Sequence, residues 1–320
     1  MKAWISRRYG GPEVLELVEQ PVPAPGADDV LIRIHATTVS SADVRLRRFN
    51  MPRGFGLIGR LALGITRLRQ PVLGSDFAGT VAATGKRVTA FKPGDAVIGF
   101  AGAATGCHAQ YCVMSTRKPL VLKPASLTFG EAASLPFGGM TALHFLRKVQ
   151  LRAGETVLVT GASGAVGSAF VQLARHAGAA VTGVTSSRNL DLVRSLGAAR
   201  VIDYTREDFT NMDDTWDVIV DTVAASSFRA CVPRLKPHGR YVSVSGDLSE
   251  LLARRAGTKK TFGGPAAERP EDLGELVSLA QRGILKPVID RTCAFEELPQ
   301  AHAYVETGRK RSSVVVSGFL

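Results

Sequence analysis

Three glycines spaced three residues apart, Gly161, Gly164 and Gly167, lie where an apolar run gives way to an apolar pattern at helical spacing. The run at 157–159 is short enough for a buried strand, and a second apolar run follows at 180–184. A strand–turn–helix–strand unit with glycines in its first turn is typical of dinucleotide sites. The glycines let the backbone approach a pyrophosphate, and the helix start offers unpaired N–H groups. The sequence therefore predicts a nucleotide site, with a tight turn in an ordinary α/β protein as the alternative.

The end of the second strand indicates which nucleotide binds. Sites that prefer NAD place an acid about 20 residues beyond the glycines, where it accepts from the ribose 2′-hydroxyl. No acid lies between Gly167 and Asp191, and two hydroxyls with a guanidinium suit a 2′-phosphate instead. We expect NADPH, with NADH the weaker ligand; the alternative is that the arginine lies in solvent. The contacts expected from the turn, the helix start and this strand end are Gly161, Ser163, Gly164, Ala165, Val166, Gly167, Ser186, Ser187 and Arg188.

Composition limits the class of protein. The 320 residues suit two domains or one large one, and 45% hydrophobic with 21% charged residues is ordinary for a chain with a sizeable core. No apolar run approaches the roughly 18 residues of a membrane span, and the first residues lack the apolar core of a signal peptide. The net charge of +12 is scattered and no nucleic-acid-binding motif appears. We expect a cytoplasmic protein that forms a homodimer, binds no nucleic acid and does not insert stably into membranes.

The elements change in type along the chain. Residues up to about 123 read as strands separated by Pro and Gly turns, including an alternating run at 30–35. Helices are predicted at 129–135 and 140–149, and strands at 200–203, 218–221 and 240–245. This alternation predicts a doubly wound parallel sheet. A helix at 299–307 and an apolar strand at 313–317 follow, and we expect that strand to return to the first domain.

Several motifs occur together in one order. They are YGGPEVL at 9–15, LGSDFAG at 73–79, FKPGDAV at 91–97, GGMTA at 138–142, and LGA at 196–198 with VIDY at 201–204. In these motifs the chain resembles the medium-chain dehydrogenase/reductase superfamily over essentially its whole length. The resemblance is closest to the zinc-free quinone-oxidoreductase (zeta-crystallin-like) branch.

This resemblance implies an α/β fold with two domains. Residues 1–123 and 290–320 would form a GroES-like β-rich catalytic domain, and residues 124–289 a Rossmann domain. It also implies NADPH-dependent reduction of quinones or of activated C=C bonds in α,β-unsaturated carbonyls. Zinc-dependent relatives supply Cys, His and Glu ligands where this chain has serines and an aspartate, at Ser40, Ser75 and Asp76. Without thiolate and imidazole ligands a zinc site has no basis, so we expect no metal.

The resemblance also suggests residues for catalysis and cofactor binding. Relatives commonly place Asn where Ser40 stands, beside the nicotinamide, so Ser40 and Asp43 are the candidates for catalysis. The alternatives are local backbone bonding for Ser40 and a helix cap for Asp43. The remaining expected cofactor contacts are Thr141, Tyr204, Thr222, Val223 and Ser245, with Gly246 beside the same cleft. The segment at 308–313 departs from the family's glycine-and-lysine pattern, which puts a cofactor contact there in doubt.

Residues 51–70 are rich in Gly, Leu and Ile, and the window 44–70 holds seven arginines and no acid. Three interpretations remain open: a mobile basic lid over the cleft, a helix lying on a membrane surface, or a loop that covers the domain's own core.

The function of the whole chain has competing interpretations too. The alternatives to a quinone or enone reductase are an NADPH-binding sensor or structural protein with little turnover, and a zinc-dependent alcohol dehydrogenase.

Overall fold

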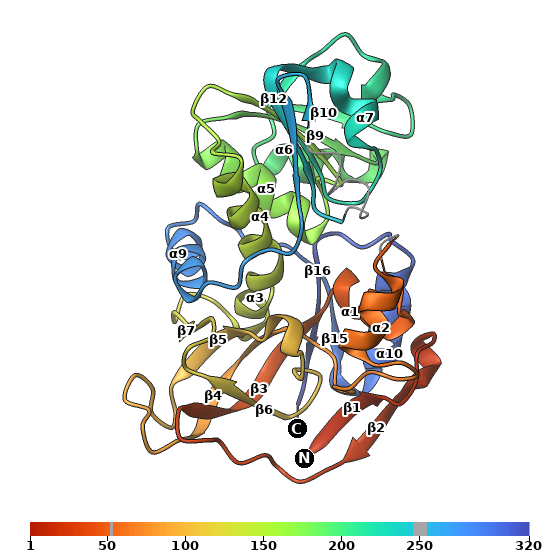
Figure 1. Cartoon of the computed structure of the whole chain (residues 1–320). Coiled ribbons are helices and arrows are strands. Elements are labelled where there is room, and N and C mark those ends of the chain that lie inside the picture. The colour runs from red at the N-terminus through yellow and green to blue at the C-terminus, as the bar shows by residue number, and fades with distance from the viewer. Residues whose placement is uncertain (52–53, 246–254, 320) are drawn as a thin grey trace.

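Two seven-stranded β-sheets organise the chain, each in its own structural unit (Figure 1). The structure is a computed structural model that describes residues 1–51, 54–245 and 255–319. In Figure 1 the middle of the chain forms the upper unit, and the two ends of the chain meet in the lower unit.

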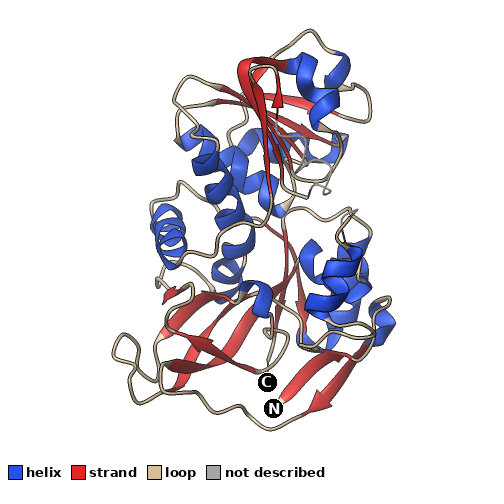
Figure 2. Cartoon of the chain, viewed as in Figure 1, coloured by secondary structure: helices blue, strands red, loops and turns tan. Residues whose placement is uncertain are grey.

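The upper unit contains a parallel sheet with the strand order β10-β9-β8-β11-β12-β14 and a short antiparallel β13 at its edge. Numbered along the chain, these parallel strands follow the order 3-2-1-4-5-6 of the Rossmann fold. Val157, Val159 and Val220 are fully buried, as expected for strands covered on both faces. Figure 2 shows helices on both sides of this sheet, so the predicted doubly wound fold is confirmed. The elements are β8 (Thr156–Thr160), β9 (Ala180–Thr185), β10 (Arg200–Asp203), β11 (Trp216–Asp221), β12 (Leu235–Ser243), β13 (Arg255–Ala256), β14 (Lys259–Gly263), α4 (Pro136–Lys148), α5 (Ala165–His176), α6 (Leu190–Ser195), α7 (Phe228–Cys231) and α9 (Pro270–Gln281), with short 3-10 helices η3 (Ser187–Asn189), η4 (Phe209–Asn211) and η5 (Val232–Arg234).

The lower unit contains the sheet β15-β16-β3-β4-β5-β7, with β6 also pairing with β3, and a separate pair of β1 with β2. The apolar strand predicted at 313–317 does return to this unit, where β16 pairs antiparallel with β3 and Val314 lies opposite Val39. The elements are β1 (Lys2–Ser6), β2 (Leu15–Glu19), β3 (Asp29–Val39), β4 (Asp76–Thr84), β5 (Ala96–Phe100), β6 (Tyr111–Ser115), β7 (Leu120–Leu122), β15 (Ile289–Ala294), β16 (Ser313–Ser317), α1 (Ser41–Arg48), α2 (Gly56–Leu63), α3 (Phe129–Ala133) and α10 (Leu298–Glu306), with short 3-10 helices η1 (Pro12–Val14), η2 (Gly102–Ala104) and η6 (Phe295–Glu297).

The helix predicted at 140–149 begins four residues earlier, at Pro136, and ends at Lys148. Proline is favoured at the first helical position because its missing N–H would have no partner there. Gly138 lies inside this helix, and any larger residue there would place its Cβ 2.3 Å from the Ala165 carbonyl oxygen. The glycine therefore lets α4 approach the start of α5.

Candidate functional site

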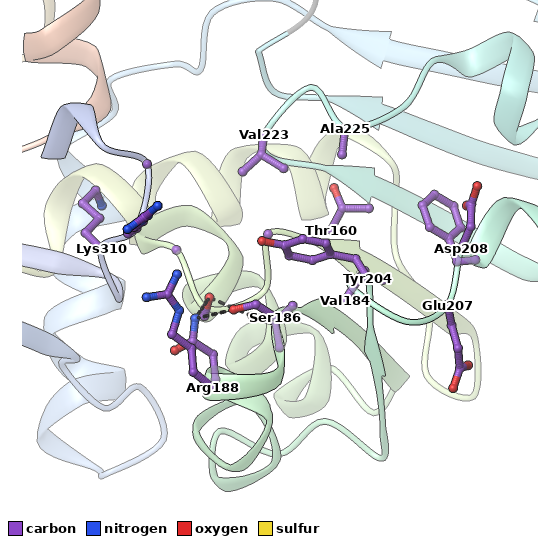
Figure 3. A pocket seen from close by; sticks show the side chains of 18 residues that line it. Thr160, Val184, Ser186, Arg188, Tyr204, Glu207, Asp208, Val223, Ala225 and Lys310 are labelled. Carbon is purple, nitrogen blue, oxygen red and sulfur yellow. Dashed lines mark hydrogen bonds between the residues drawn. The ribbon is translucent and has the colours of Figure 1, made fainter.

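A cavity of about 520 Å³, here called the strand-end cavity, opens at the carboxyl ends of β8, β9 and β10 (Figure 3). The glycine turn 161–167, the residues after β9 and β10, and the loop after β11 all contribute to its lining. Doubly wound sheets bind ligands at the carboxyl ends of their strands, near the point where the strand order reverses, which here lies between β8 and β11. The predicted cofactor contacts that line the cavity are Gly161, Ser163, Gly164, Ser186, Arg188, Tyr204 and Val223.

The three glycines of the turn have different roles. Gly161 has a φ of +64°, and a Cβ there would lie 2.5 Å from a Val223 methyl carbon. A Cβ on Gly167 would lie 2.1 Å from the Gly161 carbonyl oxygen, so this glycine allows α5 to pack closely on β8. Gly164 has an ordinary φ of −79°, and its Cβ would meet only the Gly161 carbonyl oxygen, at 3.3 Å. Gly164 therefore is the glycine that leaves space for a ligand.

Gly164 is also the N-cap of α5, and no side chain caps this helix end. The first N–H groups of a helix have no partner within the helix. In α5 they lie beside the strand-end cavity, together with the positive end of the helix dipole, and can receive a phosphate.

The loop after β11 is held by the buried carboxylate of Asp221. This carboxylate accepts from the Thr160 hydroxyl at 2.8 Å, the Val223 N–H at 3.0 Å and the Ala225 N–H at 3.1 Å. The carboxyl ends of β8 and β11 are thereby joined, and Val223 is placed on the cavity wall.

The residues that follow β9 separate into two groups. Ser186 and Arg188 line the strand-end cavity, and Arg188 is exposed there. Ser187 does not line it, because its hydroxyl donates to the Asp203 carboxylate and lies 3.1 Å from the Thr205 hydroxyl. The Ser187 hydroxyl is also the main cause that lowers the pKa of Asp203.

Other predicted contacts lie outside the lining of the strand-end cavity. The Thr141 hydroxyl donates to the Phe137 carbonyl oxygen at 2.7 Å, within α4. The Thr222 hydroxyl donates to the Thr160 carbonyl oxygen at 2.7 Å, so its hydrogen is used in a bond to the backbone of β8. Gly246 lies outside the described residues. The predicted contacts that do not line the cavity are Thr141, Ala165, Val166, Gly167, Ser187, Thr222 and Ser245.

The lower unit contributes residues to the cavity that were not among the predicted contacts and come from the segment where a contact was in doubt. Gly308, Arg309 and Lys310 line it, and they come from the segment between α10 and β16. The Ser312 N–H donates to the Ser163 carbonyl oxygen at 2.7 Å, which joins this segment to the glycine turn. The one available signal was the run of basic residues at 309–311, in a stretch that departs from the resembled family's pattern.

Lys310 is half-buried by surface area, but its ammonium group lies deep enough for burial to lower its pKa to about 8. The nearby charges of Asp290, Asp76 and Asp43 act in the opposite direction and favour the ammonium form. Its Nζ donates to the Ser312 carbonyl oxygen. Lys310 thus carries a titratable positive charge at the wall of the cavity.

The strand-end cavity has ends of opposite charge. In Figure 3, Arg188 and Lys310 lie toward one end, and Glu207 and Asp208 lie at the other. The two acids come from the segment after β10 and were not among the predicted contacts. An anionic group of a ligand is therefore favoured at the Arg188 end.

The two residues predicted for catalysis form a helix cap. Ser40 is the N-cap of α1, and its hydroxyl donates to the Asp43 carboxylate at 2.6 Å. The same carboxylate accepts from the Ser40 N–H at 2.8 Å and the Gly74 N–H at 2.9 Å. Both side chains are buried, and neither lines the strand-end cavity.

The positions where relatives carry zinc ligands make other contacts here. The Ser75 hydroxyl donates to the Gly102 carbonyl oxygen at 2.9 Å. The Asp76 carboxylate accepts from the Thr38 hydroxyl at 2.6 Å and the Phe137 N–H at 2.9 Å, and burial raises its pKa to about 7. Within the described part of the chain, no group of three or more His, Cys, Asp or Glu side chains is arranged to hold a metal ion. Metal independence stays a prediction.

Known proteins match this chain over nearly its full length. Residues 26–130 match the family described as the alcohol dehydrogenase GroES-like domain, and residues 196–316 match the one described as zinc-binding dehydrogenase. The chain is 34% identical to 2-methylene-furan-3-one reductase of Solanum lycopersicum, over 99% of this chain and 79% of that protein. It is 32% identical to the chloroplastic NADPH-dependent alkenal/one oxidoreductase of Arabidopsis thaliana, with the same coverage.

A solved structure agrees with these relatives. The quinone oxidoreductase from Coxiella burnetii superposes with a TM-score of 0.87 at 30% identity and covers 99% of both chains. The order of motifs, the two sheets and these matches lead to one assignment. The chain belongs to the medium-chain dehydrogenase/reductase superfamily, in its quinone-oxidoreductase-like branch.

Proposed function

We propose that the protein is an NADPH-dependent oxidoreductase that reduces quinones or the activated C=C bonds of α,β-unsaturated carbonyls by metal-free hydride transfer. The observation that carries the proposal is the strand-end cavity, in which a helix start without a side-chain cap and a cationic end meet near the reversal of the strand order. The names of the relatives, alkenal/one oxidoreductase and quinone oxidoreductase among them, support this class of substrate.

The lining of the cavity fits a dinucleotide that carries a 2′-phosphate. Gly164 leaves room beside the α5 N-terminus for a pyrophosphate. Arg188, Arg309 and Lys310 supply positive charge, and a guanidinium forms charge-assisted hydrogen bonds to phosphate. Glu207 and Asp208 would repel that phosphate only at the end of the cavity opposite Arg188. We therefore propose NADPH over NADH.

When bound, NADPH supplies the hydride, and the residues of the chain bind, orient and stabilise charge. Reduction of a carbonyl-conjugated bond places negative charge on the substrate oxygen, which hydrogen-bond donors must stabilise. The Ser40 hydroxyl is the first proposed donor, and to act it must turn from Asp43 Oδ2 toward the substrate. A water held by the Asp43 carboxylate is the second.

Consumption of NADPH with a panel of quinones and enals tests the activity. Oxidation of NADPH with at least one of these substrates supports a reductase. Tight NADPH binding without consumption would favour the alternative of a sensor or structural protein. Oxidation of simple alcohols that stops when a bound metal is removed would favour the zinc-dependent alternative.

We further propose a homodimer in the cytoplasm that acts on small molecules. None of the described helices is both long enough and apolar enough to cross a membrane. Some relatives are named as chloroplastic or mitochondrial proteins, so fractionation of the source cells is needed. Light scattering of the purified protein measures its oligomeric state.

A further inference from the structure

The outer face of α2 carries large apolar side chains in water. Leu57 is 76% exposed, Ile58 62% and Leu61 60%, and Ile65, in the turn that follows, is 67% exposed. Leu61 is four residues after Leu57 and three after Ile58, and these two spacings place side chains on one face of a helix. These four residues are called the α2 patch below.

The inner face of α2 already makes the helix's contacts with its own unit. Gly59 is buried, and a Cβ there would lie 3.1 Å from Met51 Cγ. Leu63 and Leu68 pack with the core of the lower unit. The core-covering role that the sequence left open therefore applies to these inner residues and does not explain the α2 patch.

The charges around the α2 patch are positive. Several arginines of the window 44–70 are engaged, since Arg47 and Arg48 pair with Glu306, and Arg60 lies 4.1 Å over the Phe49 ring. Arg67 and Arg69 are exposed, and neither makes an ion pair with any residue that the structure describes. They lie two and four residues after Ile65 in the chain.

A surface hollow of about 610 Å³ adjoins the α2 patch. Arg7, Arg67 and Arg69 line it together with Ile65. Of the three arginines, Arg7 is paired with an acid, Glu16, at 2.7 Å. Positive charge and exposed apolar surface thus meet at Ile65.

We propose that α2 and the turn after it dock on a membrane surface whose lipids carry anionic headgroups. The α2 patch enters the boundary between headgroups and acyl chains, and Arg67 and Arg69 contact the lipid phosphates in the hollow. Such binding combines buried apolar area with attraction to negative lipids, and it requires no spanning helix. Contiguous exposed apolar surface marks interaction sites, and the absence of acids in this window selects a negatively charged partner.

Co-sedimentation with lipid vesicles tests the proposal. The protein should bind vesicles of phosphatidylcholine mixed with phosphatidylglycerol, bind vesicles of phosphatidylcholine alone much less, and be released by added salt. Arg67→Gln with Arg69→Gln should weaken binding on the order of 30-fold, since each arginine near the surface contributes to the attraction. Leu57→Ser with Ile58→Ser and Leu61→Ser should weaken it about tenfold or more.

A matched control removes the same charge elsewhere. Arg229 and Arg282 are exposed in the upper unit, so Arg229→Gln with Arg282→Gln should bind vesicles as the parent protein does. Circular dichroism and NADPH fluorescence check that all variants fold and keep the cofactor site. Equal weakening by this control would overturn the proposal, because general positive charge would then explain binding.

Other occupants of the α2 patch give different results. Absence of binding to anionic vesicles overturns the proposal outright. Conversion of a dimer to a monomer by the three serine substitutions would assign the patch to a second copy of the chain. A raised KM for a water-soluble quinone, without vesicle binding, would instead assign the segment to a lid.

Discussion

The backbone N–H of Ser312 donates to the carbonyl oxygen of Ser163 at 2.7 Å, and the Ser312 hydroxyl lies 3.1 Å from that of Ser168. These contacts join the segment before β16 to the glycine turn, so both units contribute to the wall of the strand-end cavity. Arg309 and Lys310 reach the cavity because this segment is fixed there. We expect ligand binding to stabilise the two units together.

Gly164→Val should abolish NADPH binding and keep the fold. The φ of −79° at Gly164 is open to any residue, so valine adds no backbone strain there. The branched side chain would occupy the space left for the pyrophosphate. Gly167→Ala should instead destabilise the fold, because its Cβ would lie 2.1 Å from the Gly161 carbonyl oxygen. Thermal melting and NADPH fluorescence separate the two effects; normal NADPH binding by Gly164→Val would show that the site is misplaced.

NADPH should bind at least about tenfold more tightly than NADH, which is the roughly 1.4 kcal/mol that one charge-assisted pair supplies. Arg188→Ala should erode this preference, because Arg188 is exposed at the cationic end of the cavity. Arg206→Ala is the control, since Arg206 is 79% exposed and does not line the cavity. Titrations of both cofactors measure the preference; equal dissociation constants in the parent protein would contradict it.

NADPH affinity should fall as the pH rises above 8. Burial lowers the pKa of Lys310 to about 8, so below this pH the side chain is an ammonium that attracts phosphate. Above it the free protein loses the charge, and affinity should drop by up to about tenfold per pH unit until the pKa of the bound state is reached. Lys310→Arg should keep the affinity and flatten the profile, because arginine does not titrate in this range. A parent profile as flat as that of Lys310→Arg would remove Lys310 from the site.

Ser40→Ala should lower turnover by roughly 10- to 1,000-fold with little change in NADPH affinity, if its hydroxyl stabilises the substrate oxyanion. It should also destabilise the protein by about 1 kcal/mol, because Ser40 caps α1. Thr128→Ala is the matched control, since Thr128 forms the same kind of capping box at the start of α3. Stability loss in both variants with unchanged turnover in both would restrict Ser40 to the cap.

Activity should survive prolonged chelation, and the purified protein should contain far less than one zinc per chain. Ser40, Ser75 and Asp76 stand where relatives have ligands, and their side chains bond to other groups of the chain. Elemental analysis and rates measured before and after chelation test this. Stoichiometric zinc whose removal stops the reaction would refute it.

The fold was predictable where apolar runs are strong. Strands such as β10 and β16 were predicted with their observed bounds. By contrast, β14 was not predicted, because its sequence KKTFG has no apolar run and pairing with β12 determines its conformation. The predicted start of α4, at residue 140, was also wrong, because Gly138 and Gly139 look like helix breakers in sequence. In the fold they allow close packing, with a Cβ on Gly139 only 2.8 Å from Leu276 Cδ1.

The candidate site was predictable on the side of the upper unit. The glycine turn, Ser186 and Arg188 follow from local sequence, and they line the cavity. Arg309 and Lys310 could not be found in this way. Their position depends on a backbone hydrogen bond between residues 149 positions apart, Ser312 to Ser163, and no side-chain pattern encodes it.

The pairing of β16 with β3 has a consequence for the order of events during synthesis. Both strands belong to one sheet, but the whole upper unit is made between them. Domains generally fold as units while the chain emerges from the ribosome, and distant strands pair late because loop closure costs entropy. We therefore expect the upper unit to form first, while residues 36–39 of β3 wait for β16, because β4 and β6 are made earlier and pair with the rest of that strand. The segment that carries Arg309 and Lys310 arrives with β16, so the wall of the strand-end cavity is completed only in the last step of folding.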